Sequence, residues 1–241
     1  IINMKKILYS VCILLAVSCT KFDDALYDSS PIAKQSIVPV YKELADLIDD
    51  NGWWFWAQEV SSDEVVFPVR GTDWNDGGKW RVLHQHAWTN DVDAVNSMWS
   101  HLFDGVREAN KLLDVLSDQQ GDPLVAVDIA KIKTLRAFFM YLAMDNYGDI
   151  PIITSFVNAP PLPFKAERKE VYEFLINDLK PIVSLLPIST NKFAVSRGMA
   201  YSLMAKLYLN AEVYTGTPAY SEAEAMCDSV IGLGTYVLQN D

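Results

Sequence analysis

The sequence is poor in cysteine and in basic residues, and each shortage excludes a class of protein. Only three cysteines occur among 241 residues, which excludes a scaffold held together by several disulfides. Lysine and arginine number 20 against 31 aspartate and glutamate residues, a net charge of −11, and this balance argues against binding nucleic-acid phosphates or anionic lipid through charge. Half of the residues are hydrophobic and seven are tryptophan, so a folded domain is expected rather than a disordered chain.

The sequence also lacks the short motifs that accompany common enzyme chemistry. It contains no G-x-S-x-G nucleophile turn, no phosphate-binding loop, no G-x-G-x-x-G segment and no H-E-x-x-H zinc motif. The adjacent acids Asp63 and Glu64 would point in different directions and would not flank one glycosidic bond. We therefore expect a protein that is not an enzyme and that needs no cofactor.

A short apolar run near the beginning predicts export and a lipid anchor. Taking Met4 as the start, a basic pair precedes residues 7–18 (ILYSVCILLAVS), a run too short to span a bilayer as a stable helix. Small residues then lead to Cys19, as in a bacterial lipoprotein signal, although Ala16 stands where leucine is usual. The prediction is a signal peptide at 4–18 and lipidation at Cys19, where several acyl chains would give stable anchoring. An ordinary cleaved signal with an incidental cysteine is the alternative.

Apolar residues at helical spacing predict a mainly α fold with at most short strands. Six helices are expected, over residues 33–50, 91–117, 125–146, 167–186 and 196–215, with the sixth running from a capping box at Ser221 and Glu224 to about Gly232. Pro181 should bend or end the fourth helix. The short runs Val65–Phe67 and Ile152–Ile153 are the best strand candidates.

The last helices indicate tetratricopeptide-like hairpins. Small and aromatic residues alternate along 196–232 in a way that lets two antiparallel helices approach closely. One such pair cannot bury its own faces, so an earlier, degenerate pair is expected at about 125–186. The folded region is then 19–241, a set of helical hairpins with an irregular, aromatic-rich loop region.

That loop region holds the residues best suited to binding. Six of the seven tryptophans lie between residues 53 and 88, around the glycine-rich segment RGTDWNDGG at 70–78. The apolar faces of sugar rings stack on aromatic planes, and their hydroxyls need carboxylate, amide and guanidinium partners. The predicted glycan-binding residues are Arg70, Asp73, Trp74, Asn75, Asp76 and Trp80. For Trp74 and Trp80, burial in the core is the equal alternative.

The sequence also offers two candidate metal sites and one candidate ion pair. Asp73, Asn75 and Asp76 offer oxygen ligands for calcium, but their spacing is not that of an EF-hand. His84 and His86 would share one face of a strand, yet no third ligand stands at metalloprotease spacing, so a solvated or hydrogen-bonded pair is favoured. Arg136 should pair with a buried acid that the sequence does not identify.

Residues 132–154 (IKTLRAFFMYLAMDNYGDIPIIT) carry a resemblance to a known family. They are similar to the segment of SusD/RagB-family lipoproteins in which an R-A-x-x-Y helix runs into an N-Y-G-D-[IV]-P turn. Val60–Glu64 resembles the family's S-x-D-E segment, and Ala200–Leu209 resembles its A-x-x-x-L-x-A-K-x-Y-L helix. The motifs follow one another in the family's order. Family members are usually much longer, so we expect this chain to correspond to the N-terminal portion.

The resemblance implies a role as well as a fold. It implies a lipid-anchored protein exposed on the outer membrane, which binds glycans without cutting them and works with a TonB-dependent transporter in their uptake. Some glycan contacts in related proteins come from the loop after S-x-D-E, which is the loop singled out above. The alternatives are a secreted glycoside hydrolase of the same uptake system and a tetratricopeptide scaffold for a protein partner.

Overall fold

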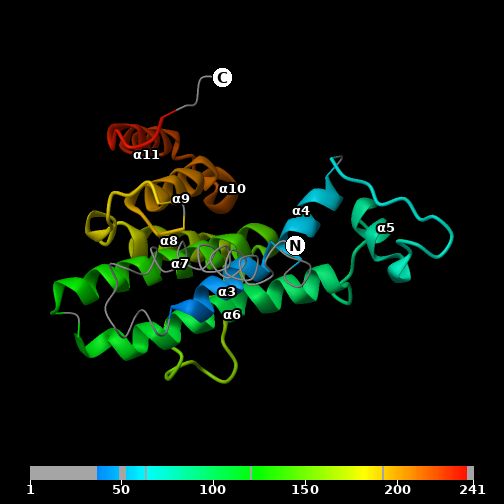
Figure 1. Cartoon of the computed structure of the whole chain (residues 1–241), viewed down its shortest axis with the longest axis horizontal. Coiled ribbons are helices and arrows are strands. Elements are labelled where there is room, and N and C mark those ends of the chain that lie inside the picture. The colour runs from blue at the N-terminus through cyan, green and yellow to red at the C-terminus, as the bar shows by residue number, and fades with distance from the viewer. Residues whose placement is uncertain (1–36, 49–52, 63, 120, 192, 238–241) are drawn as a thin grey trace, which may run out of the picture.

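The structure is a computed structural model, and Figure 1 shows the whole chain. It describes residues 37–48, 53–62, 64–119, 121–191 and 193–237. The predicted signal peptide at 4–18, the lipidation site Cys19 and the acid Asp63 lie outside the described residues.

The described residues form a mainly helical fold, as the sequence predicts. The α-helices are α3 (Val38–Asp46), α4 (Trp54–Ser61), α5 (Lys79–His84), α6 (Asp93–Leu116), α7 (Pro123–Tyr147), α8 (Arg168–Leu179), α9 (Arg197–Leu209), α10 (Ala211–Thr215) and α11 (Tyr220–Gly232). Three-residue 3₁₀ turns lie at Asp76–Gly78, Ser117–Gln119 and Val183–Leu185. Within the described residues none of these helices is both long and apolar enough to cross a membrane.

The long helices α6 and α7 run in opposite directions and form the centre of the fold (Figure 1). Asp122 caps α7 by accepting a hydrogen bond from the Leu124 N–H at 2.8 Å, and Pro123 supplies the first helical residue. The two helices meet closely at Gly105, where a Cβ would come within 2.5 Å of the buried ring of Phe139. The absence of a side chain at Gly105 is therefore what lets α6 approach α7.

Helices α8 to α11 stack in succession on α7, and α3 packs on α6 (Figure 1). The fourth predicted helix, α8, stops at Leu179, because Pro181 cannot continue it. The fifth predicted helix is broken at Asn210 into α9 and α10, and Gly216, with φ of 77°, ends it.

The predicted capping box at the start of the last helix is wrong. Ser221 and Glu224 do not form the expected capping box, because α11 begins at Tyr220 and its N-cap residue makes no side-chain hydrogen bond. A reciprocal capping box of this kind is formed instead by Glu167 and Glu170 at the start of α8.

The strands also differ from the expectation. The antiparallel pair is β1 (Ile150–Pro151) with β2 (Lys165–Ala166), so neither Val65–Phe67 nor Ile152–Ile153 is a strand. A strand needs a neighbour for its backbone groups, and the proline-rich return of the chain brings 165–166 beside 150–151. Phe67 is instead packed among tryptophan rings.

Candidate functional site

The aromatic-rich region between α4 and α5 extends to one side of the helical body (Figure 1). Its rings pack on one another, and Trp53 and Trp80 also join the hydrophobic core of the helical body. The Trp80 ring lies 5.4 Å from that of Trp53, 5.8 Å from that of Trp56 and 4.5 Å from that of Phe67, measured between centroids. Trp53 and Trp80 are both only 8% exposed. These rings form a small aromatic core that supports the loop.

Trp74 is the ring that this aromatic core presents to solvent. It stacks on Phe67 with 4.6 Å between centroids and 25° between the planes, and the edge of Trp80 lies 5.8 Å away. Trp74 nevertheless remains 43% exposed. One ring face is held by Phe67, so the exposed area belongs to the rest of the indole, which is the arrangement a stacking platform requires.

Trp80 and Asp76 are joined to each other. The indole Nε1–H of Trp80 donates a hydrogen bond of 2.7 Å to Asp76 Oδ2. A buried indole N–H needs such a partner, and Asp76 provides it from four residues earlier, just before α5. The structure therefore places Trp80 beneath the surface as a support for Trp74, with one Asp76 oxygen engaged in holding it there.

The other predicted binding residues lie exposed on the turn that carries Trp74. Arg70 and Asp73 exchange two backbone hydrogen bonds, of 3.2 and 3.1 Å, which close the turn. Their side chains and that of Asn75 are exposed. The loop thus brings together a ring face, a guanidinium, a carboxylate and an amide within six consecutive positions.

The backbone of this region is strained. Among the described residues, the non-glycine residues with positive φ are Trp53 (62°), Trp74 (55°), Asp76 (38°) and His86 (53°); Trp53 directly precedes α4, and the other three lie between α4 and α6. Left-handed backbone is unfavourable for residues with a Cβ and is retained where the surroundings enforce it. Such strain concentrates at functional sites, so it supports a function for this loop.

Two hollows border the aromatic region. One, of about 180 Å³, is lined by Trp74 together with Trp53, Trp56, Lys79 and Trp80. The ammonium of Lys79 lies 4.6 Å from the centroid of the Trp53 ring and 5.2 Å from that of Trp80. Sequence reasoning missed Lys79, although its position beside Trp80 in a tryptophan-rich segment was the available signal.

The second hollow, of about 160 Å³, lies between α4 and the α6–α7 pair. Trp88, 44% exposed, lines it together with Gln58 and Asn146, whose amides are joined by a 2.7 Å hydrogen bond. Trp88 was predicted only as one of the six clustered tryptophans. No sequence spacing links Gln58 with Asn146, since they lie 88 residues apart.

The candidate histidine pair of this region does not form a metal site. His84 ends α5 and His86 follows it, so the two do not share a strand face. His86 Nε2 lies 2.6 Å from the carbonyl oxygen of Ser61, which confirms the hydrogen-bonded alternative. In the described part of the chain, Asp73 and Asp76 do not meet a third acidic, histidine or cysteine side chain at metal-binding distance.

The turn after α7, at 147–151, serves the helical body. The Tyr147 hydroxyl donates a 2.6 Å hydrogen bond to the carbonyl of Val95, and burial raises the pKa of Tyr147. Asp149 accepts from the Arg168 N–H at 3.0 Å and pairs with Lys165 at 3.1 Å, and these contacts lower the pKa of Asp149. This turn therefore anchors α8 and the strand pair.

The acid that pairs with Arg136 is Asp178 of α8, at 2.6 Å. The same guanidinium donates to Asn110 Oδ1 of α6 at 2.8 Å and to the carbonyl of Thr154 at 3.2 Å. Arg136 thereby ties α6, α7, α8 and the segment after β1 to one buried group.

Comparison with known proteins assigns this fold and loop to a family. The family profile described as "Starch-binding associating with outer membrane" matches residues 30–209, most of the chain. The chain belongs to the SusD-like family. This confirms the resemblance read from the three sequence motifs. The family is one of carbohydrate-binding, non-catalytic proteins.

Individual SusD-like relatives agree with this assignment. The chain is 26% identical over 180 residues to the starch-binding protein SusD of Bacteroides thetaiotaomicron, an alignment that covers 74% of this chain and 31% of the relative. A laminarin-binding SusD-like protein superimposes with a TM-score of 0.70 at 23% identity, over 87% of this chain and 46% of its own. Surface glycan-binding protein A from Bacteroides uniformis superimposes with a TM-score of 0.69 at 20% identity, over 86% and 47%. The two structural matches show a shared fold, and the chain spans less than half the length of each of these three relatives.

Proposed function

We propose that this chain binds glycans without cleaving them, and that Trp74 is the platform on which a sugar ring stacks. The observation that carries the proposal is the exposed indole of Trp74, supported on one side by Phe67 and anchored from below by the Asp76–Trp80 hydrogen bond. A rigid, partly exposed ring loses little conformational freedom when it binds, which favours affinity.

The polar residues beside Trp74 supply the second half of glycan recognition. Arg70, Asp73 and Asn75 present donors and acceptors on the same turn, and the free oxygen of Asp76 adds another acceptor. Hydroxyl pairs of a sugar suit such bidentate partners. Trp80 acts through Trp74 in this arrangement, because it is buried and holds the platform in place.

The cellular setting belongs to the same proposal and rests on the family resemblance. Lipidation at Cys19 would tether the protein to the outer membrane with its body on the cell surface, and the partner would be a TonB-dependent transporter that imports the captured glycan. Incorporation of labelled palmitate that disappears in Cys19→Ala tests the anchor. Co-purification with a large β-barrel transporter tests the partnership.

Binding is tested by calorimetry of the full chain against a panel that includes starch-derived oligosaccharides and laminarin oligosaccharides, the ligands named for two relatives. Trp74→Ala is expected to weaken the best ligand at least about tenfold, or about 1.4 kcal/mol. Trp88→Ala is the matched control, since Trp88 is exposed to the same extent (44% against 43%) but lies outside the turn.

Two results would contradict the proposal. Equal binding by the wild type and Trp74→Ala, with loss in Trp88→Ala, would move the site to the hollow beside Gln58 and Asn146. Release of reducing sugar from the bound glycan by the pure protein would show the hydrolase alternative instead.

A further inference from the structure

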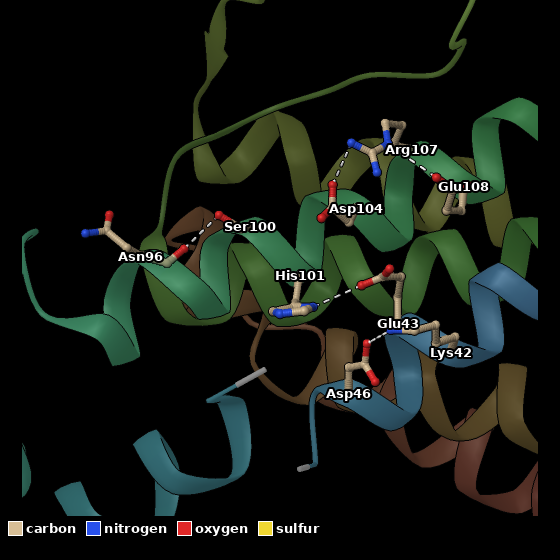
Figure 2. A network of polar contacts seen from close by, with 9 residues as sticks. All are labelled: Lys42, Glu43, Asp46, Asn96, Ser100, His101, Asp104, Arg107 and Glu108. Carbon is tan, nitrogen blue, oxygen red and sulfur yellow. Dashed lines mark hydrogen bonds and ion pairs between the residues drawn. The ribbon is translucent and has the colours of Figure 1, made fainter. Parts of the chain in front are cut away.

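A polar cluster outside the aromatic loop joins α3 to α6, as Figure 2 shows. Glu43 and Asp46 lie three residues apart on α3, so they share a face of that helix. His101 of α6 points toward them, with its Nδ1 3.0 Å from Glu43 Oε2 (Figure 2). One ligand atom from each of the three residues lies within 4.8 Å of the other two.

The packing around the cluster fixes these three side chains in position. Val40 on α3 and Leu47 directly after it are almost fully buried, and so is Leu102, the neighbour of His101 on α6. The side chains of Glu43 and Asp46 are each only 14% exposed, and that of His101 is 24% exposed. The donors are therefore partly withdrawn from solvent and held by two helices that pack against each other.

The charges of the cluster are those of a cation site. Two carboxylates stand together in partly buried positions, where an uncompensated charge is unfavourable. Among the described residues, the ammonium of Lys42 forms an ion pair with Asp46. Its side chain is 66% exposed, so it can swing into solvent and leave both carboxylates to another cation.

We propose that Glu43, Asp46 and His101 bind a first-row divalent transition-metal ion, with zinc as the preferred biological ion. A nitrogen donor beside two carboxylates suits zinc and its neighbours, whereas calcium and magnesium prefer oxygen donors alone. Zinc holds nitrogen and oxygen ligands at about 2.0–2.2 Å, which puts the donors of one ion about 3–4 Å apart. The present separations reach that range through small side-chain rotations. The ion would clamp α3 to α6 and retain water in its remaining coordination positions.

Titration of the metal-free full chain with zinc chloride, followed by calorimetry, tests the site. We expect one zinc ion per chain, with binding weakened at least about tenfold in His101→Ala and in Asp46→Asn. Lys42→Ala should bind zinc more tightly than the wild type, because the competing ammonium is gone. His84→Ala, which removes an exposed histidine of α5, is the control and should bind zinc as the wild type does.

Titration with cobalt chloride gives a second measurement of metal binding, which does not depend on the stability of the variants. The wild type should give visible absorption bands from a nitrogen- and oxygen-ligated ion, and these bands should disappear in His101→Gln, a variant that keeps a polar side chain of similar length. The proposal is overturned if zinc does not bind saturably at concentrations up to the order of 100 μM. It is also overturned if binding survives in His101→Ala and His101→Gln but is lost in His84→Ala.

Discussion

Replacing Arg136 with methionine should destabilise the helical body strongly, because this guanidinium is buried and joins three helices. Its side chain is 4% exposed and that of its partner Asp178 is 10% exposed. Methionine keeps much of the length and apolar volume of the arginine stem. The substitution therefore removes the charge and the hydrogen bonds while it leaves the packing of α7 largely intact.

The size of the loss follows from what Arg136→Met leaves behind. Breaking a buried ion pair by removing one partner costs about 3–5 kcal/mol. Asp178 would keep its 2.8 Å contact with Lys133, which moderates the penalty, whereas Asn110 Oδ1 and the Thr154 carbonyl would each lose a donor. We expect a loss of about 3 kcal/mol in the free energy of unfolding, a large fraction of the 5–15 kcal/mol typical of folded domains.

Urea unfolding followed by circular dichroism measures this loss. Lys133→Met is the matched control, because it removes the other cation of Asp178 from a side chain that is 30% exposed, and it should cost about 1 kcal/mol or less. Adding Asp178→Leu to Arg136→Met should recover part of the stability, since no buried charge is then left without a partner. Equal losses for Arg136→Met and Lys133→Met would refute the reasoning, because burial would then not decide the cost.

Two further predictions concern packing and pH. Gly105→Ala should lower the free energy of unfolding by about 1–2 kcal/mol, because overpacking against Phe139 outweighs the gain in helix propensity. Gly121→Ala should not lower it, because a Cβ there meets no atom within 4 Å. Urea unfolding of the two variants compares them. Burial raises the pKa of Tyr172 to about 12, so the fold favours the neutral hydroxyl. This preference contributes stability below a pH of about 10, the pKa of tyrosine in the unfolded chain. The contribution is lost as the pH rises towards 12. Tyrosinate absorbance and unfolding measured against pH should show this loss in the wild type and a smaller one in Tyr172→Phe, and identical pH profiles would contradict the assignment.

The long helices could be predicted because their apolar periodicity is long and their ends are marked, whereas the short helices α4 and α5 lie in the region expected to be an irregular loop. Pro123 and Gly148 bound α7, and the structure places its ends within two residues of the predicted 125–146. The strand predictions failed where a partner distant in sequence decides the outcome. Ile150–Pro151 became a strand because 165–166 returns beside it. The capping box at Ser221 failed for a local reason, since α11 begins one residue earlier, at Tyr220.

The candidate site shows the same division between local and distant information. The composition of 70–78 indicated where a binding loop lies, but it could not separate an exposed tryptophan from a buried one. Trp74 and Trp80 are six residues apart, yet one is 43% exposed and the other 8%. The difference comes from the rings of Trp53 and Trp56, which pack against Trp80, and from the Asp76 hydrogen bond to Trp80.

The exposed turn at 70–76 and the centre of the helical body are held by different contacts. The turn rests on the rings of Phe67 and Trp80, and Trp80 in turn belongs to the hydrophobic core. The body is held by the Arg136 network and the α6–α7 contact at Gly105. A substitution on the turn at 70–76 therefore perturbs few contacts of the body. If the turn binds glycan as proposed, its residues can change while α6, α7 and α8 keep their arrangement.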